Sequence, residues 1–196
     1  MTLADRFTSV RLILAPAFFA VYFLPRFFSA HIIPAYTVPV LLIIFIVSEV
    51  TDLLDGIVAR KMAEVSDFGK LYDPFADTLT QITYFLCFVI DGILSPLLFL
   101  LVLYREFSIL FLRNLMLKKG IALGARMSGK VKTVFYISAA SLALLVSCAM
   151  RLGLGGEFLV WLAVAAKVVF LLAVIIAVTS FIEYVFVYIK TPKKAL

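Results

Sequence analysis

Residues 52–77 read DLLDGIVARKMAEVSDFGKLYDPFAD and place Asp52, Asp55, Asp73 and Asp77 in a chain that is otherwise strongly hydrophobic. The first two aspartates are three residues apart and the last two are four apart, so each pair lies on one face of a helix. An ionisable residue in a membrane span costs free energy and is usually functional. The segment therefore predicts a functional site on two consecutive helices.

The composition around this segment is that of a membrane protein. The 196 residues are 64% hydrophobic and 15% charged, and the mean hydropathy is +1.14. Typical soluble domains are roughly 45–50% apolar and about 25% charged. Apolar stretches of the roughly 20 residues that a span needs recur along the chain. We predict an all-α polytopic membrane protein with one domain, residues 1–196.

Glycine and proline mark the breaks between six predicted transmembrane helices. A short amphipathic segment, residues 1–9, is expected to lie on the membrane surface before the first span. The spans are expected at residues 10–29, 34–60, 70–91, 95–118, 130–150 and 157–190.

Basic residues are distributed unevenly over the predicted loops. With the N-terminus inside, the outer segments hold only Arg26 and Arg151, and the other basic residues of the loops and helix ends lie inside. This distribution follows the positive-inside rule, and it predicts that both termini and the aspartates face the cytoplasm. The net charge of +6 fits anionic lipid headgroups or an anionic substrate, and it argues against nucleic acid as a partner.

The four aspartates have a ligand chemistry that suits hard cations. The connecting segment, residues 61–69, is short, so the two pairs can face each other, where their charges repel. Mg²⁺ or Mn²⁺ between the pairs would relieve this repulsion, because these ions prefer oxygen ligands. Four aspartates suit a two-metal site. The alternative is that they lie in headgroup water at the helix ends without a ligand.

The residues between the two pairs favour a phosphate ligand. Gly56 and Ala59 share the acidic helix face and, lacking bulk, let a ligand approach closely. Arg60 adds a bidentate phosphate donor, and Gly69 places another small residue at the head of the next helix. Metals, an arginine and open helix faces together indicate a pyrophosphate site.

The complete pattern, Asp-x2-Asp-Gly-x2-Ala-Arg-x8-Gly-x3-Asp-x3-Asp, resembles the signature of the CDP-alcohol phosphatidyltransferase family. The resemblance implies a six-span fold, a homodimer and two divalent cations held by the four aspartates. It implies Asp77 as the general base. The residues that would receive the CDP moiety are Asp52, Gly56, Ala59, Arg60 and Gly69.

A second set of basic residues bears on the acceptor. Arg105 and Arg113 are eight residues apart on the predicted fourth span, and Arg126, Lys130 and Lys132 follow on the inner side. Surplus cations suit an acceptor that itself carries phosphate. The alternative for the last three is a role in topology and lipid contact. An arginine within a span needs a partner, and Glu106 or Asp77 could supply one.

The stretch YREFSILFLRNLMLKKGIALGARMSGKVKT, residues 104–133, resembles a bacterial branch of this family, the phosphatidylglycerophosphate synthases. Thr8, Arg11 and Pro16 resemble the amino-terminal segment of the same branch. The resemblance implies CDP-diacylglycerol as the donor, glycerol 3-phosphate as the acceptor, and the bacterial cytoplasmic membrane as the location.

Two other functions remain open from the sequence. A sibling transferase could use inositol phosphate, phosphatidylglycerol or another alcohol. A cation transporter could use the aspartates for its ions, although its acidic residues should then reach both faces of the membrane. Lys167 and Glu183 are the residues of the last span that could extend such a path, and Lys167 could instead lie at a dimer interface.

Overall fold

The computed structural model describes residues 3–28, 34–62, 69–118 and 127–190, and within them it contains six helices and no strand. The all-α prediction is confirmed, and apart from the start of α1 the helix bounds lie within a few residues of the predicted spans. The amino-terminal residues from Leu3 onward are continuous with the first span rather than forming a separate segment. The helices are α1 (Leu3–Phe27), α2 (Pro34–Met62), α3 (Gly69–Ile90), α4 (Pro96–Lys118), α5 (Met127–Arg151) and α6 (Glu157–Lys190).

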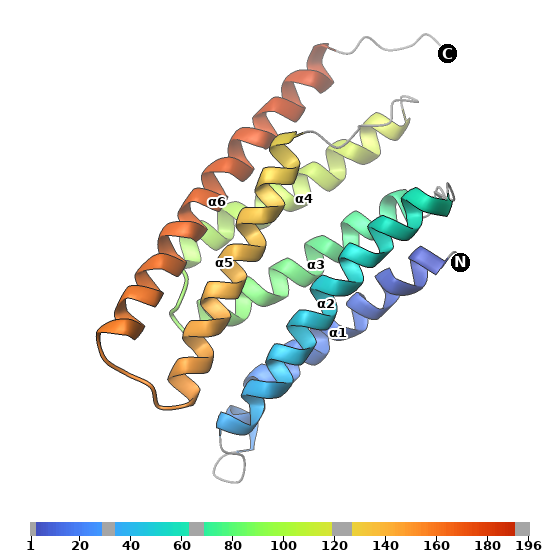
Figure 1. Ribbon diagram of the computed structural model, residues 1–196. Coiled ribbons are helices and arrows are strands. Elements are labelled where there is room, and N and C mark those ends of the chain that lie inside the picture. The colour runs from blue at the N-terminus through green and yellow to red at the C-terminus, as the bar shows by residue number, and fades with distance from the viewer. Residues whose placement is uncertain (1–2, 29–33, 63–68, 119–126, 191–196) are drawn as a thin grey trace.

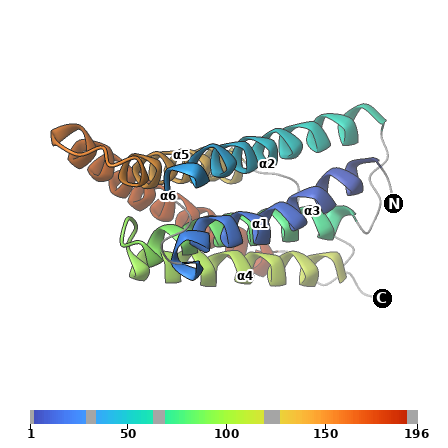
Figure 2. The ribbon, with the colours of Figure 1, turned by 90° about the horizontal axis from the view of Figure 1, so that it is seen from below.

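Consecutive helices run in alternating directions through one elongated bundle (Figure 1). The start of α1 and the end of α6 therefore lie at the same end, which we call the terminal end, together with the end of α2 and the start of α3. The opposite, distal end carries the turns after α3 and α5. Viewed from below, α2 and α5 lie in one layer and α1, α3 and α4 in another (Figure 2).

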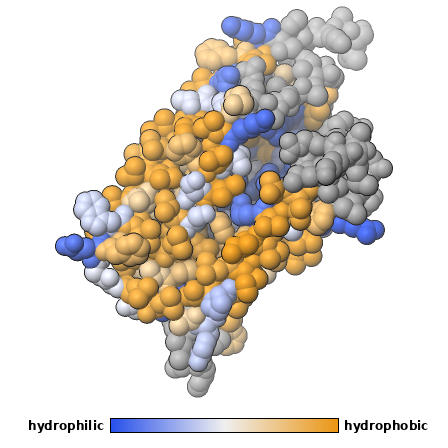
Figure 3. Space-filling view, in the orientation of Figure 1, coloured by the Kyte–Doolittle hydropathy of each residue, from blue (hydrophilic) through white to orange (hydrophobic). Residues whose placement is uncertain are grey.

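The lengths and surfaces of the helices suit a bilayer. Among the described residues, α1, α2, α5 and α6 contain stretches long and apolar enough to cross a membrane. Helices α3 and α4 have 22 and 23 residues, which at about 1.5 Å per residue gives a similar reach. Hydrophobic residues cover most of the face in Figure 3, and most of the strongly hydrophilic ones gather at its upper right. The protein is a polytopic membrane protein.

The core differs between the two sides of the bundle. Around α1 and α3 it is aromatic, with Phe18 and Tyr84 in edge-on contact at 4.6 Å between ring centroids. Between α5 and α6 it is made of small residues, and Ala139, Ala143 and Ala173 are fully buried. Small side chains let two membrane helices approach closely, so α5 and α6 form a tight pair.

Two glycines close helices at the distal end. Gly92 after α3 and Gly153 after α5 have φ angles of 72° and 70°, which non-glycine residues adopt rarely. The amide of Ile93 donates to the carbonyl of Phe88 and that of Gly92 to Val89, at 2.9 Å in both cases. This is the Schellman arrangement that satisfies the last carbonyls of a helix, and it sets the direction in which α4 leaves α3.

Candidate active site and metal centre

Three of the four predicted aspartates meet between α2 and α3. One carboxylate oxygen each of Asp52, Asp73 and Asp77 lies within 4.8 Å of the other two. Their side chains are 36%, 45% and 38% exposed, respectively, so they are neither sealed in the core nor fully solvated. Asp55 lies one helical turn beyond Asp52 on α2, and its side chain falls outside the described part of the structure.

The donor set fits a divalent cation. Three carboxylates that converge within one coordination sphere offer only hard oxygen ligands, which Mg²⁺ and Mn²⁺ prefer. Like charges at this separation repel strongly unless a cation lies among them. The family signature and this cluster together make the protein a candidate metal-dependent enzyme.

A residue of α1 completes the cluster. The side chain of Arg11 is 2% exposed and forms ion pairs with Asp52, Asp73 and Asp77. Helix α1 packs against both α2 and α3, which explains why its arginine reaches aspartates of both. The sequence pattern did not assign Arg11 to the site. Arg11 also lies within a span, however, and like Arg105 and Arg113 it therefore needs an acidic partner.

A polar cavity of about 190 Å³ adjoins the aspartates. Asp77, Thr78 and Gln81 form its α3 wall. The remaining charged residues of its wall come from α4 and α5 and are Arg105, Glu106, Arg113, Lys130 and Lys132. Among the described lining residues four side chains are basic and two acidic, so the cavity carries a net positive charge beside a carboxylate cluster.

Glu106 is the centre of a buried ion-pair network in this wall. Its Oε1 accepts hydrogen bonds from Arg105 Nη1 at 2.8 Å and from Lys132 Nζ at 3.1 Å. Arg105 Nε also donates to the Ala177 carbonyl of α6 at 3.1 Å, and Lys132 Nζ lies 4.5 Å from the centre of the Tyr136 ring. The network therefore joins α4, α5 and α6, and it confirms Glu106 as the partner of Arg105.

Arg113 and Lys130 differ from the two cations that Glu106 binds. Both line the cavity, Lys130 is exposed, and Arg113 Nε is buried without a hydrogen-bond partner among the described residues. A buried polar group without a partner is costly, so Arg113 has donor capacity to offer a ligand. Arg126, also predicted for this set, lies outside the described residues.

The other predicted site residues are placed only by their backbones. Gly56, Ala59 and Arg60 lie on the last turns of α2, where the structure describes no side chains, and Gly69 is the first residue of α3. They are thus at the terminal end, as the aspartates are.

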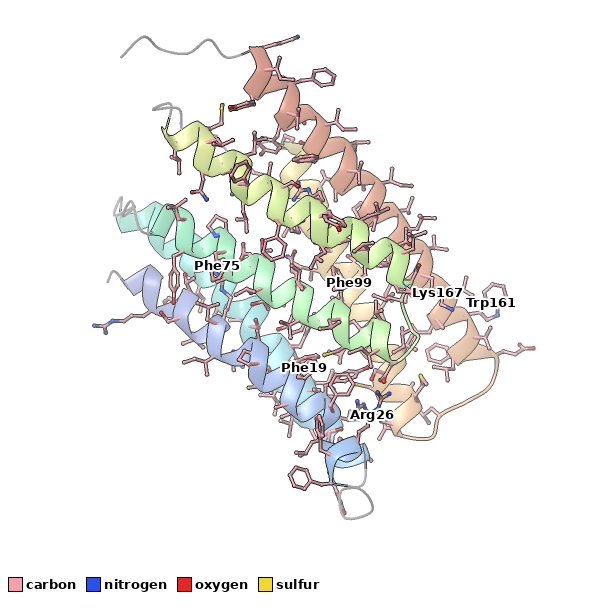
Figure 4. The ribbon with its side chains drawn as sticks, turned by 180° about the vertical axis from the view of Figure 1, so that it is seen from behind. Phe19, Arg26, Phe75, Phe99, Trp161 and Lys167 are labelled. Carbon is pink, nitrogen blue, oxygen red and sulfur yellow. The ribbon has the colours of Figure 1, made fainter. Side chains whose placement is uncertain are left out.

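The residues considered for a transport path do not extend the acidic cluster. Glu183 accepts a hydrogen bond from Ser128 at 2.7 Å at the terminal end. Lys167 and Trp161 are exposed on α6 (Figure 4), away from the cavity.

Converging carboxylates beside a basic cavity suit a membrane enzyme that acts on a phosphate ester. The sequence model of the CDP-alcohol phosphatidyltransferase family matches residues 1–179. The chain belongs to this family. Members of the family depend on metal ions in general, and the aspartate cluster could hold one.

Named relatives share most of the chain. It is 38% identical over 192 residues to a CDP-diacylglycerol–glycerol-3-phosphate 3-phosphatidyltransferase of Treponema pallidum, covering 94% of this chain and 88% of the relative. A Bacillus subtilis protein of the same name is 31% identical to this chain, over 73% of this chain and 76% of the length of the relative. A probable phosphatidylglycerophosphate synthase of Mycobacterium tuberculosis is 30% identical to this chain, over 93% of this chain and 79% of the length of the relative.

Proposed function

We propose that the protein transfers a phosphatidyl group from CDP-diacylglycerol to the primary hydroxyl of glycerol 3-phosphate, giving phosphatidylglycerophosphate and CMP. The names of the relatives support both substrates. The single structural observation that carries the proposal is the basic cavity that begins at Asp77 and contains Arg113, whose Nε has no partner within the described ranges of the chain. An acceptor bearing its own phosphate suits such a cavity.

The metal site in this proposal holds two divalent cations, Mg²⁺ or Mn²⁺, on Asp52, Asp55, Asp73 and Asp77. Bound there, the ions would neutralise the pyrophosphate and stabilise the CMP leaving group. Asp52, Gly56, Ala59, Arg60 and Gly69 would receive the CDP moiety. The family signature supports these roles, and the convergence of three of the aspartates supports the ligand set.

The acceptor would lie in the cavity with its phosphate on Arg113 and Lys130. Among the described residues the charged wall has a net charge of two positive, which complements a phosphate dianion. Lys132 and Arg105 contribute positive potential, but their donors already engage Glu106. We therefore place them behind Arg113 and Lys130 as phosphate ligands. Arg126 remains a candidate from the sequence alone.

The chemistry follows from the position of Asp77, which lines the acceptor cavity and belongs to the carboxylate cluster. The hydroxyl oxygen of glycerol 3-phosphate attacks the phosphatidyl phosphorus, and Asp77 accepts the proton that this hydroxyl loses. The new phosphorus–oxygen bond forms while the bond to the bridging pyrophosphate oxygen breaks, and CMP leaves with that electron pair. The cavity wall fixes the hydroxyl near Asp77 and so reduces the entropic part of the barrier.

The proposed setting is the bacterial cytoplasmic membrane, with the terminal end on the cytoplasmic side and two copies forming a homodimer. The excess of basic residues in the segments at that end supports this orientation. Water-soluble glycerol 3-phosphate would then enter from the cytoplasm, and CMP would leave to it.

A CMP-release assay tests the proposal directly. Purified protein receives CDP-diacylglycerol and Mg²⁺ or Mn²⁺, and candidate acceptors are added one at a time. We expect release that depends on both the metal and glycerol 3-phosphate. Release stimulated by inositol phosphate or phosphatidylglycerol instead would make the protein a sibling transferase and refute the acceptor assignment.

A further inference from the structure

The position of Arg11 conflicts with the metal site that it completes. Its guanidinium pairs with Asp52, Asp73 and Asp77, and the same three residues supply the oxygens that converge within 4.8 Å. A cation with several donors can bridge three carboxylates at once. Arg11 and a divalent cation therefore compete for the same three carboxylates.

The two cations cannot bind these carboxylates together without a cost in free energy. A guanidinium and a divalent ion in contact with one carboxylate lie a few ångströms apart and repel each other. The guanidinium must therefore move away from at least part of the cluster when metal binds. Because Arg11 is buried, it needs another anionic partner, since an unpaired charge in the core is strongly unfavourable.

Glu49 offers such a partner. It precedes Asp52 by three residues on α2, so the two lie on the same helix face. A small cavity of about 20 Å³ is lined by Arg11, Glu49, Asp52 and Asp77. In the described part of the chain, no hydrogen bond or ion pair engages the Glu49 carboxylate.

We propose that Arg11 is a built-in counter-cation that holds the aspartates together without metal, and that metal binding transfers its guanidinium towards Glu49. The inference rests on the metal site of the proposed function. It gives α1 a defined part in that site, because the helix supplies the charge that the metal replaces. It also assigns Glu49, which the family signature does not include, as the residue that receives Arg11.

Metal affinity of the full-length protein in detergent tests the proposal. Mn²⁺ binding is measured by calorimetry, without donor or acceptor, for wild type, Arg11→Gln, Glu49→Gln and the double variant. Loss of one positive charge next to the ion should tighten binding in Arg11→Gln by about tenfold or more. Glu49→Gln should weaken binding about fivefold in the wild-type background and far less in the Arg11→Gln background.

The exposed residue Arg6, five positions earlier on α1, supplies the matched control, and Arg6→Gln should leave Mn²⁺ affinity unchanged. Unchanged or weaker binding in Arg11→Gln would overturn the competition between Arg11 and metal. An equal loss from Glu49→Gln in both backgrounds would overturn the transfer to Glu49. Failure of wild type itself to bind Mn²⁺ would refute the metal site and with it the proposed function.

Thermal unfolding covers the case in which Arg11→Gln folds poorly without metal. Its Tm should be lower than that of wild type in chelator and should rise more on addition of Mn²⁺, because metal replaces the missing charge. Arg11→Lys keeps a charge but, with one ammonium, pairs with fewer carboxylates, so its Mn²⁺ affinity should lie between those of wild type and Arg11→Gln. An equal or smaller rise in Tm for Arg11→Gln than for wild type counts against the proposal.

Discussion

The two ends of the bundle differ in whether their charged and polar side chains satisfy one another. At the distal end, Tyr22 donates to Asp91 at 2.6 Å and Arg26 pairs with the same carboxylate. Arg151 donates to Thr37 at 2.9 Å and to the Tyr22 carbonyl at 2.8 Å. Acidic, basic and hydroxyl groups of three helices, α1, α2 and α5, and of the turn after α3 satisfy one another there. From the sequence, this end was notable only for holding few basic residues, Arg26 and Arg151, yet both belong to a polar network whose members satisfy one another.

At the terminal end the charges are not balanced locally. Three carboxylates converge on one guanidinium. The neighbouring cavity carries excess positive charge, and the Nε donor of its Arg113 has no partner in the part of the chain that the structure describes. Polar groups that satisfy one another stabilise a fold, whereas groups left in excess can bind a ligand. This difference is why the proposed function is assigned to the terminal end, although both ends contain arginine, aspartate and tyrosine.

Removing one aspartate at each end should give the largest contrast. Asp73→Asn takes a metal ligand from the proposed site and should lower CMP release by about a thousandfold or more, an effect within the span expected for essential groups. Asp91→Asn at the distal end should keep turnover per folded molecule near that of wild type. Comparable losses in the two variants would remove the functional distinction between the ends.

The acceptor cavity gives the next effect. Arg113→Ala removes a charged phosphate donor, which should raise the KM for glycerol 3-phosphate by about 10- to 100-fold, the equivalent of a charged hydrogen bond of 1.5–3 kcal/mol. The KM for CDP-diacylglycerol should stay constant. Steady-state kinetics with each substrate varied in turn checks this, and a shift confined to the donor would mean that Arg113 faces the nucleotide lipid.

The polar network at the distal end should contribute to the free energy of unfolding. Arg151→Gln loses several hydrogen bonds and the stacking on Tyr22, where the guanidinium lies 4.5 Å from the ring centre. At about 1 kcal/mol for each hydrogen bond, we expect a loss of roughly 2–3 kcal/mol and a lower Tm. The kcat of the folded fraction should not change. A normal Tm with reduced kcat would reverse the assignment.

The smallest effect should come from Lys132, because its ammonium already binds both oxygens of Glu106, at 3.1 and 3.3 Å. Lys132→Ala should raise the KM for glycerol 3-phosphate only a few-fold, less than Arg113→Ala, since a shared charge contributes less to a ligand. Kinetics of the two variants side by side checks the order. An effect of Lys132→Ala larger than that of Arg113→Ala would make Lys132 the principal phosphate ligand.

The sequence predicted the helices well because each is long, apolar and bounded by glycine or proline. It also predicted that Asp52 would meet Asp73 and Asp77, since spacing fixed each helix face and a short connection brought the helices together. Periodicity cannot tell which non-adjacent helices are neighbours, so it missed that α1 brings Arg11 to the aspartates. It also grouped Lys132 with the surplus cations, because nothing in the local sequence shows that the Lys132 ammonium on α5 binds Glu106 on α4.

Asp77 lies where two otherwise separate parts of the molecule meet. The carboxylate cluster with its arginine comes from α1, α2 and α3, whereas apart from α3 the cavity wall comes from α4, α5 and α6. In the proposed function, one half would activate the nucleotide lipid and the other would select the alcohol. Acceptor preference could then diverge by substitutions in the last three helices while the first three stayed intact. Grafting α4 to α6 from a relative with another acceptor is a rational route to a new headgroup specificity.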